Sequence, residues 1–237
     1  MSQSGAGHPA ARASGLGSNS SVGAVSAAVV TFATAGFGVT MFLPAPWWSY
    51  AMAMLLAPAF VVLAASLGAE AVPERRSVAL AGVTFAGMYG SLAIVVYFIQ
   101  LTTVLQNSAS LDILQALSDT MGSLMFNLDL LSYGLMALST LFIGLSMKPS
   151  TTADRVLQVL LVVHGVFAPV CVLMPALNIF GTMEDSEGRT IGLLVLVGWC
   201  LYFTPIGLLA FIHFLRFAHD IPERSEPDRR ATTGSST

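Results

Sequence analysis

A single acidic residue interrupts an apolar stretch of this chain, in a position where it could take part in chemistry. The stretch FNLDLLSYGLM, residues 126–136, surrounds Asp129 with mostly apolar side chains and contains no basic partner. On membrane-insertion scales an Asp at the centre of a helix costs about 2.5–3.5 kcal/mol, whereas each Leu, Ile, Phe or Val favours insertion by only about 0.3–0.6 kcal/mol. We therefore expect Asp129 to be protonated, to accept several hydrogen bonds, or to face water.

Polar residues on a neighbouring apolar stretch can reach the same depth as Asp129. Tyr133 shares its helical face, and the preceding stretch runs in the opposite direction and brings Tyr97 and Gln100 alongside. Asn127 can join from the loop side. We predict that two helices share a polar cluster made of Tyr97, Gln100, Asp129 and Tyr133. The cluster is either a ligand or proton site, or a set of interhelical bonds worth about 0.6 kcal/mol each.

One histidine lies in the middle of another apolar stretch. A neutral His164 bonded to a backbone carbonyl is one interpretation, and a proton relay with Asp129 through water is the other. His213 is predicted to lie at the end of a span, in the interfacial region. Because the two histidines differ in depth, we do not expect them to hold a haem together. We predict neither a metal nor a cofactor.

Common signatures of catalysis and of nucleic-acid binding are missing from the sequence. There is no HExxH zinc motif, no GxSxG serine elbow and no glycine-rich phosphate loop. The formal net charge is −3, and no basic run could neutralise a series of phosphates. We therefore expect no nucleic-acid partner, and an enzyme is the less favoured class.

The composition is that of a membrane protein. Hydrophobic residues make up 55% and charged residues 10% of the 237 residues, and the mean hydropathy is +0.76. A soluble domain carries about 25% charged residues, so this chain could not cover a water-facing surface. A helix needs about 20 apolar residues to cross a bilayer. The sequence predicts an all-α, polytopic bundle of six transmembrane helices, at about 23–43, 48–68, 78–105, 124–147, 156–180 and 190–215.

The loops between the spans predict the orientation of the chain. With six spans, the two termini share one side with the 69–77 and 148–155 loops. That side holds nine of the 10 Lys and Arg residues, and Arg189 alone lies on the other. Because basic loops stay on the cytoplasmic side, we predict a cell-membrane protein with both termini in the cytoplasm.

Segments outside the spans are mostly polar. Residues 1–21 and 219–237 are predicted to be disordered cytoplasmic tails on either side of a 22–218 transmembrane domain. The longest loop, 107–123, has leucines at three-residue spacing and acidic residues elsewhere on the helical wheel, which predicts a short amphipathic helix on the outer surface. This helix either covers a cavity or lies passively at the interface.

Small residues and prolines mark places where the spans can pack closely or break. Gly82, Ala86 and Gly90 form the small-xxx-small pattern that lets membrane helices approach each other. Prolines interrupt three of the spans, at Pro58, Pro169, Pro175 and Pro205. Broken helices can line binding sites in transporters, and simple kinks are the alternative.

Two stretches carry a resemblance to known proteins. YFIQLTTVLQN, residues 97–107, and MFNLDLLSYGLMALSTLF, residues 125–142, resemble a group of bacterial six-span integral membrane proteins of about this length. The likeness consists of a Tyr-x-x-Gln-Leu-Thr run near the outer end of the third helix and an Asp in the fourth. It implies that Gln100, Thr102 and Asp129 belong to a shared feature, and it implies no function.

Two classes of function are compatible with these observations. The first is a transporter or binding protein for a small solute or cation, with Asp129 at the polar end of a cavity. The second is a non-catalytic membrane subunit, sensor or scaffold in which the polar cluster only packs helices. The expected partners are the lipid bilayer and, for the first class, the solute. A homo-oligomer is compatible with either class.

Overall fold

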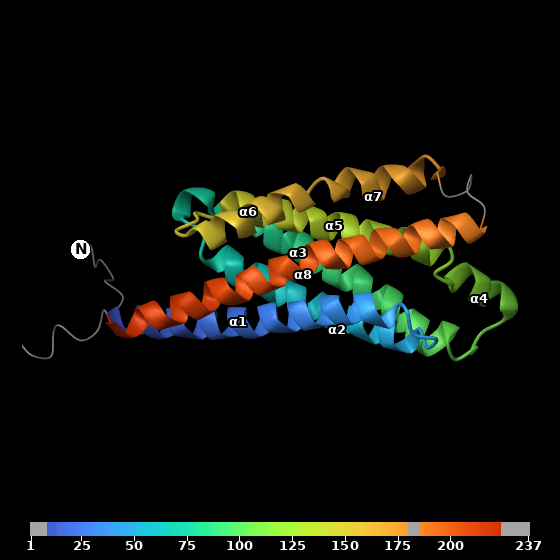
Figure 1. The fold of residues 1–237 in the computed structure, drawn as a ribbon, viewed down its shortest axis with the longest axis horizontal. Helices are drawn as coiled ribbons and strands as arrows, with labels where there is room; N and C mark the ends of the chain where they lie inside the picture. The colour runs from blue at the N-terminus through green and yellow to red at the C-terminus, as the bar shows by residue number, and fades with distance from the viewer. Residues whose placement is uncertain (1–8, 180–184, 224–237) are drawn as a thin grey trace, which may run out of the picture.

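The computed structural model describes residues 9–179 and 185–223, and every regular element within these ranges is helical (Figure 1). One element, η1, is a turn of 3-10 helix, and another, η2, is a short π-helix. In chain order the elements are α1 (Pro9–Thr40), α2 (Trp47–Ala69), η1 (Pro73–Arg75), α3 (Arg76–Ile99), η2 (Gln100–Val104), α4 (Leu111–Leu117), α5 (Leu124–Ser146), α6 (Thr152–His164), α7 (Phe167–Ala176) and α8 (Asp185–Glu223).

Six helical segments of the described chain are long and apolar enough to cross a membrane. They are Asn19–Thr40, Trp47–Ala69, Pro73–Val104, Leu124–Ser146, Thr152–Ala176 and Thr190–Arg216. Each begins and ends within a few residues of a predicted span. The predicted all-α bundle of six membrane-spanning helices is therefore confirmed, and the architecture is that of a multi-pass membrane protein.

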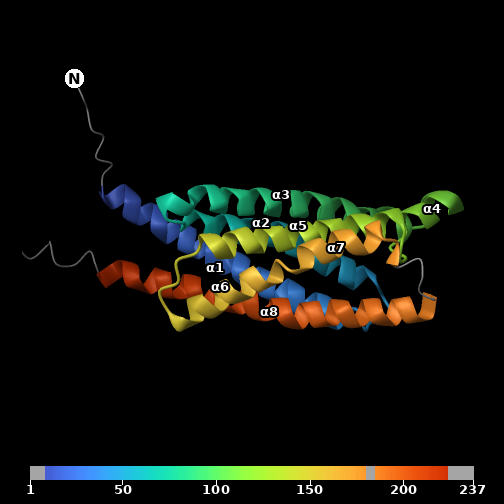
Figure 2. The ribbon, with the colours of Figure 1, turned by 90° about the horizontal axis from the view of Figure 1, so that it is seen from above.

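The spans form a ring that α8 closes. Helix α1 packs against α2 and α8, α3 packs against α2 and α5, and α5 packs against α6 and α7. Helix α6 in turn contacts α8. Figures 1 and 2 show that α1 begins and α8 ends at one end of the bundle, which we call the terminal end. Helix α4 lies at the opposite end, which we call the α4 end.

Glycines let α3 approach two neighbouring helices. A Cβ atom on Gly82 would lie 2.8 Å from Cγ1 of Ile143 on α5 and 3.0 Å from the backbone nitrogen of the same residue. A Cβ atom on Gly90 would lie 2.7 Å from Cγ2 of Val61 on α2. Ala86, between the two glycines, is fully buried. The small-residue pattern in the sequence therefore marks the contact of α3 with α5 and α2.

Aromatic side chains fill the centre of the ring of helices. The centroid of the Phe60 side-chain ring on α2 lies 5.4 Å from that of Tyr89 on α3 and 6.0 Å from that of Phe203 on α8. Trp199 stacks on Phe203 with 5.0 Å between ring centroids and meets Tyr133 of α5 edge-on, also at 5.0 Å. This core joins four helices, and it fixes the position of Tyr133 beside the polar cluster.

A proline explains why one span is divided into α6 and α7. Helix α6 ends at His164 and α7 begins at Phe167. Pro169 has no N–H to donate, and its ring would clash with the carbonyl four residues earlier, that of Gly165. The N–H of Gly165 accordingly donates to the carbonyl of Val162, at 3.0 Å, in a tighter turn. The break leaves His164 at the last position of α6.

At the terminal end the helices are longer than the sequence analysis predicts. Disorder is predicted for residues 1–21, but α1 begins at Pro9. Disorder is also predicted for residues 219–237, but α8 continues to Glu223. Proline suits the first turn of a helix, and the Ala and Arg residues that follow are strong helix formers. The remaining parts of the two predicted tails, 1–8 and 224–237, lie outside the described residues, as does 180–184.

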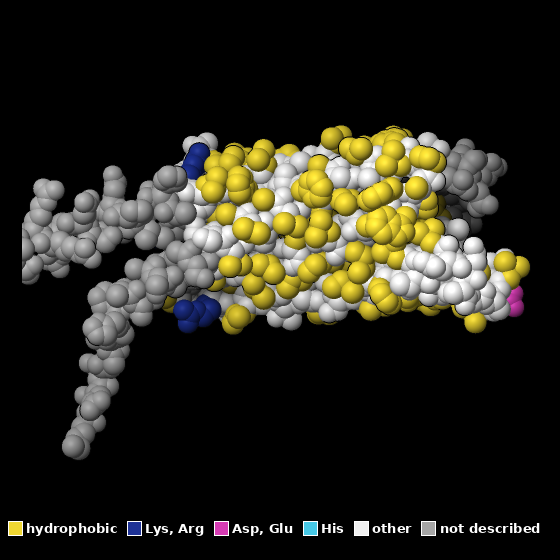
Figure 3. All heavy atoms as spheres, turned by 90° about the horizontal axis from the view of Figure 1, so that it is seen from below, with side chains coloured by type: hydrophobic (Ala, Val, Ile, Leu, Met, Phe, Trp, Pro, Cys, Tyr) yellow, Lys and Arg dark blue, Asp and Glu magenta, His cyan; other side chains and the backbone are white. Residues whose placement is uncertain are grey.

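The surface of the bundle is apolar between two charged ends. On the face drawn in Figure 3, Lys and Arg side chains lie at the terminal end and acidic side chains at the α4 end. Hydrophobic side chains cover the length between them. An apolar surface of this extent suits the hydrocarbon core of a bilayer, which is about 30 Å thick.

Candidate functional site

The predicted contact between Asp129 and Tyr97 is present. Asp129 lies in the second turn of α5, and its Oδ2 accepts a hydrogen bond of 3.1 Å from the hydroxyl of Tyr97 on α3. The other carboxylate oxygen, Oδ1, is buried and has no hydrogen-bond partner among the described residues. An unpartnered buried acceptor is unfavourable by about 1–3 kcal/mol. One carboxylate oxygen therefore has a donor, and the other lacks one within the described part of the chain.

Tyr133 extends this contact by one hydroxyl. The hydroxyl oxygens of Tyr97 and Tyr133 are 3.3 Å apart. Because the single proton of Tyr97 is donated to Asp129, Tyr133 must be the donor in this second bond. The result is an ordered relay from Tyr133 to Tyr97 to Asp129. Both tyrosines are buried, so the relay is shielded from competing water.

Gln100 was predicted to join the cluster, but its amide nitrogen is bonded elsewhere. Nε2 donates to the backbone carbonyl of Leu117, at the end of α4, over 2.7 Å. The last carbonyls of a helix lack partners within the helix, so this bond anchors α4. Gln100 opens the π-helix η2, and such wider turns occur frequently at functional sites. Its Oε1 is buried without a partner among the described residues.

Asn127 provides a third unpartnered oxygen at the α4 end. Its Nδ2 donates to the carbonyl of Gly122 at 3.4 Å, and its Oδ1 is buried with no partner in the described part of the chain. Asn127 and Asp129 lie on α5, and Gln100 lies at the end of α3, which packs against α5. All three unpartnered atoms are acceptors. Each of them could accept from an N–H or O–H group or bind a cation.

Helix α4 forms within the predicted 107–123 segment and is held to the bundle at its carboxyl end. The bond from Gln100 holds Leu117, and two residues later Oδ2 of Asp119 accepts a bond of 2.6 Å from the hydroxyl of Tyr50 on α2. The prediction of a short helix in this segment is confirmed. These two bonds connect it to α2 and to the end of α3, next to the residues that carry the unpartnered oxygens.

His164 is bonded to neighbours other than Asp129. Its Nε2 accepts a bond of 2.9 Å from the indole N–H of Trp199, and its Nδ1 is 2.8 Å from the hydroxyl oxygen of Thr140. Since Nε2 accepts, the ring proton lies on Nδ1 and is donated to Thr140, whose own proton goes to the carbonyl of Ala137 at 2.9 Å. Every polar atom of the ring is satisfied in the neutral form. This arrangement favours the structural interpretation of His164 over the proton relay.

The sequence analysis places His213 at the end of a span, but it does not predict the group of titratable residues that His213 joins at the terminal end. His213 of α8 contacts Glu70, which follows α2, and Asp154 of α6. One signal was available in the sequence: Thr151 and Asp154 have the spacing of a capping box, which places an acid in the first turn of α6. The partners of that acid on other helices were not predictable from spacing alone.

The described residues show no metal centre. They contain no group of three or more His, Cys, Asp or Glu side chains that could hold a metal ion. Cys171 and Cys200 are free and buried. The nitrogens of His213 point to two different carboxylates rather than to one shared point.

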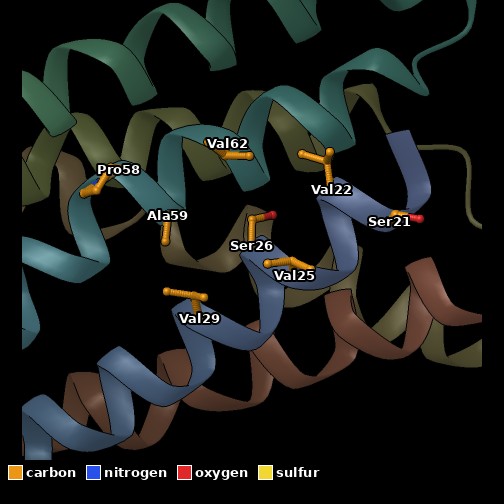
Figure 4. Close-up of a pocket in the computed structure, with 8 residues that line it drawn as sticks. All are labelled: Ser21, Val22, Val25, Ser26, Val29, Pro58, Ala59 and Val62. Carbon is orange, nitrogen blue, oxygen red and sulfur yellow. The ribbon is translucent and has the colours of Figure 1, made fainter. Parts of the chain in front are cut away.

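A shallow groove of about 460 Å³ runs along the outside of the bundle between α1 and α2 (Figure 4). Its lining is almost entirely apolar, as expected for a surface in contact with acyl chains. None of its lining residues belongs to the polar cluster around Asp129. They are Ser21, Val22, Val25, Ser26, Val29, Pro58, Ala59 and Val62.

Comparison with known proteins finds no relative of this chain. The chain matches no protein-family model, no curated protein and no solved structure. Its function must therefore be argued from its own side chains.

Proposed function

We propose that this chain binds a small cation or a hydrogen-bond-donating solute at Asp129 and holds it for passage across, or sensing at, the cell membrane. The observation that supports the proposal is Oδ1 of Asp129, which is buried and has no partner among the described residues. An ionisable group inside a membrane protein is costly, and it usually marks a pathway or a binding site. A ligand that donates to this oxygen would remove the cost of leaving it unpaired.

The chemistry of the site favours a ligand with a single positive charge or with several donors. One carboxylate supplies one formal charge, and the other unpartnered atoms, on Gln100 and Asn127, are neutral amide oxygens. A divalent ion such as Ca²⁺ takes six to eight oxygens, commonly from several carboxylates. Monovalent cations, ammonium groups and polyhydroxyl solutes need fewer charges, and they are the classes that we infer.

The orientation of the chain in this proposal follows the distribution of charge. Nine of the 10 Lys and Arg residues belong to the termini and to the loops on the same side, which supports a cytoplasmic terminal end. The α4 end, with Asp112 and Asp119, then faces outward. Acidic residues there would attract cations toward the site. Trp47 and Trp48 are half-exposed at the same end, where an interfacial aromatic belt is expected.

A second candidate is a non-catalytic membrane subunit, sensor or scaffold. The hydrogen bond from Tyr97 to Asp129 already joins α3 to α5, and both Tyr97 and Tyr133 are closely packed, at 5% and 8% exposure. In that case the polar residues serve helix packing, and the unpartnered oxygens bind water.

The replacement Asp129→Asn tests the proposal because it is nearly isosteric and removes the charge. Purified protein in proteoliposomes would be compared for binding and uptake of Na⁺, K⁺, ammonium, small amines and polyols. We expect at least one of these to bind the wild type and to bind the variant about tenfold or more weakly, since a hydrogen bond to a charged group is worth about 1.5–3 kcal/mol.

Asp112→Asn is the matched control, because Asp112 is an exposed acid at the same end. It should weaken binding far less than Asp129→Asn does, because an exposed charge acts only at a distance and is screened by salt. The proposal fails if no member of the panel binds the wild type, or if Asp129→Asn binds as the wild type does. A more stable variant with no change in binding would favour the second candidate.

A further inference from the structure

One imidazole at the terminal end of the bundle joins three helices. Nε2 of His213 on α8 is 2.7 Å from Oε2 of Glu70, which follows α2, and Nδ1 is 2.9 Å from Oδ1 of Asp154 in the first turn of α6. The three side chains are only 11%, 17% and 4% exposed, in the order His213, Glu70, Asp154. This group lies outside the Asp129 site and does not depend on the function proposed for it.

The geometry of this group requires one proton more than a neutral histidine can supply. Oδ2 of Asp154 accepts from the backbone N–H of Ser150 at 3.3 Å, from its hydroxyl at 2.8 Å and from the N–H of Thr151 at 3.0 Å. Three donors favour the ionised form of Asp154, so Nδ1 of His213 must be a donor toward it. The contact with Glu70 then needs a second proton, on Nε2 or on Oε2. Without it, a nitrogen lone pair would face a carboxylate oxygen at 2.7 Å.

Among the side chains that the structure describes at this end, the other charged groups are turned to water or bonded elsewhere. Arg75 donates to the carbonyl of Met147 at 2.6 Å, and Arg216 donates to the hydroxyl of Thr151 at 3.3 Å. Helix α1 carries no titratable side chain between residues 19 and 40. The other charged residues there, within the part of the chain whose side chains the structure describes, are exposed: Glu74, Arg76, Lys148 and Arg155. Exposed charges are screened by salt, so among the described side chains the two carboxylates are the charged groups closest to His213.

We propose that Glu70, Asp154 and His213 form a proton-binding site, and that the bound proton clamps α2, α6 and α8 together at the terminal end. With the proton, both ring nitrogens are engaged by carboxylates. When the proton leaves, one bond is lost and repulsion replaces it. The bond lost is the one to Glu70, because Nδ1–H keeps its bond to Asp154. The end of α2 is therefore the element released from α8. Since the clamped form requires the proton, the clamp closes at low pH and opens as pH rises.

Thermal stability across pH tests the clamp in the purified full-length protein. The melting temperature of the wild type in lipid nanodiscs should fall by about 2–4 °C or more between about pH 5.5 and about pH 8.5. Faster amide exchange in the last turns of α2 should accompany this fall, after correction for the intrinsic effect of pH. His213→Gln removes the titrating ring, and its melting temperature should vary much less over the same range.

Glu70→Gln provides the sharpest variant, because the new amide can donate to the lone pair of Nε2 while Nδ1–H still donates to Asp154. The clamp would then stay closed without the extra proton. We expect this variant to lose the pH dependence and to be more stable than the wild type at about pH 8.5. Glu74→Gln removes an exposed carboxylate from the same end and should keep the wild-type pH dependence.

Three outcomes would overturn the proposal. The first is a wild type whose stability does not fall with rising pH. The second is a His213→Gln variant that keeps the full pH dependence. The third is a Glu70→Gln variant less stable than the wild type at high pH, which would mean that the carboxylate stabilises the bundle without a proton. None of these measurements involves Asp129, so they stand apart from the ligand-binding experiments.

Discussion

At the scale of single residues, the bonding of Asp129 is incomplete, whereas that of His164 is complete. Tyr97 satisfies one carboxylate oxygen of Asp129 and leaves the other unpartnered among the described residues. His164 has a donor on one ring nitrogen and a hydroxyl acceptor on the other. A fully satisfied polar group stabilises the core, while a partly satisfied one is unfavourable unless something binds to it. Asp129 is thus the better candidate for function, and His164 for structure.

Tyr97→Phe should destabilise the protein by removing the one hydrogen bond that the carboxylate of Asp129 receives from the described residues. We expect a loss of about 1–2 kcal/mol, because interhelical bonds in membranes are modest and a second buried oxygen is left unpaired. Tyr133→Phe should cost less, since Tyr97 keeps its bond to Asp129. Chemical denaturation in mixed micelles measures both, and equal losses in the two variants would contradict the relay described above.

A double-mutant cycle of Tyr97→Phe and Asp129→Asn measures the interaction free energy between these two side chains. If the bond couples α3 to α5, the two losses will not be additive. Additive losses would mean that the two side chains stabilise the protein independently.

At the scale of elements, glycines and one proline determine how the helices meet. Gly82 brings α3 against the backbone of α5 at Ile143, and that approach places Tyr97 and Asp129 within hydrogen-bond distance further along the same pair of helices. Pro169 ends α6 at His164, so the ring of His164 sits at the break and packs against aromatic residues of α8. The polar contacts therefore depend on backbone features some turns away from them.

Gly82→Ala and Gly87→Ala form a matched pair on α3. A Cβ on Gly82 would lie 2.8 Å from a side-chain atom of Ile143 and 3.0 Å from its backbone nitrogen, whereas a Cβ on Gly87 would meet nothing within 4 Å. We expect the first change to destabilise the protein by about 1–3 kcal/mol through overpacking. The second should be neutral, or stabilising by up to about 1 kcal/mol through helix propensity. Unfolding free energies in the same detergent check this, and similar values for the two variants would contradict the close contact of α3 and α5.

At the scale of the whole molecule, two titratable groups lie at opposite ends of an apolar bundle. The Asp129 cluster is near α4, and the clamp of Glu70, Asp154 and His213 is at the terminal end. Between them the ring is filled mainly by aromatic and small apolar side chains. If the terminal end is cytoplasmic, the first group responds to the outer solution and the second to the pH of the cytoplasm.

Reporter fusions test the orientation on which that statement depends. Fusions after Gly68, Ser118, Ser150 and Asp185 should read cytoplasmic, external, cytoplasmic and external, because basic loops stay in the cytoplasm. Two reporters should be fused at each site, one active only in the cytoplasm and one active only outside, so that each loop is assigned by two independent signals. A reversed order at all four sites would mean that the protein has the opposite orientation in the membrane, with the same fold. A broken alternation would contradict the six spans.

Much of the architecture, and one contact of the site, follow from the sequence. Long apolar runs in a nearly uncharged chain determine membrane-spanning helices, because backbone groups in lipid must be bonded within the helix. Depth along two antiparallel helices, together with helical spacing, places Tyr97, Asp129 and Tyr133 together, and their hydrogen bonds confirm it.

Only the tertiary structure decided which side chains meet across the ring. Gln100 bonds Leu117, His164 bonds Trp199, and His213 lies between Glu70 and Asp154. Each of these contacts depends on the rotation of a helix about its axis and on the order of helices around the ring. Helices that face lipid on one side and apolar neighbours on the other are apolar all round, so periodicity does not show which face turns inward. That rotation is set by the glycine contacts and the aromatic core, which exist only once the helices have packed.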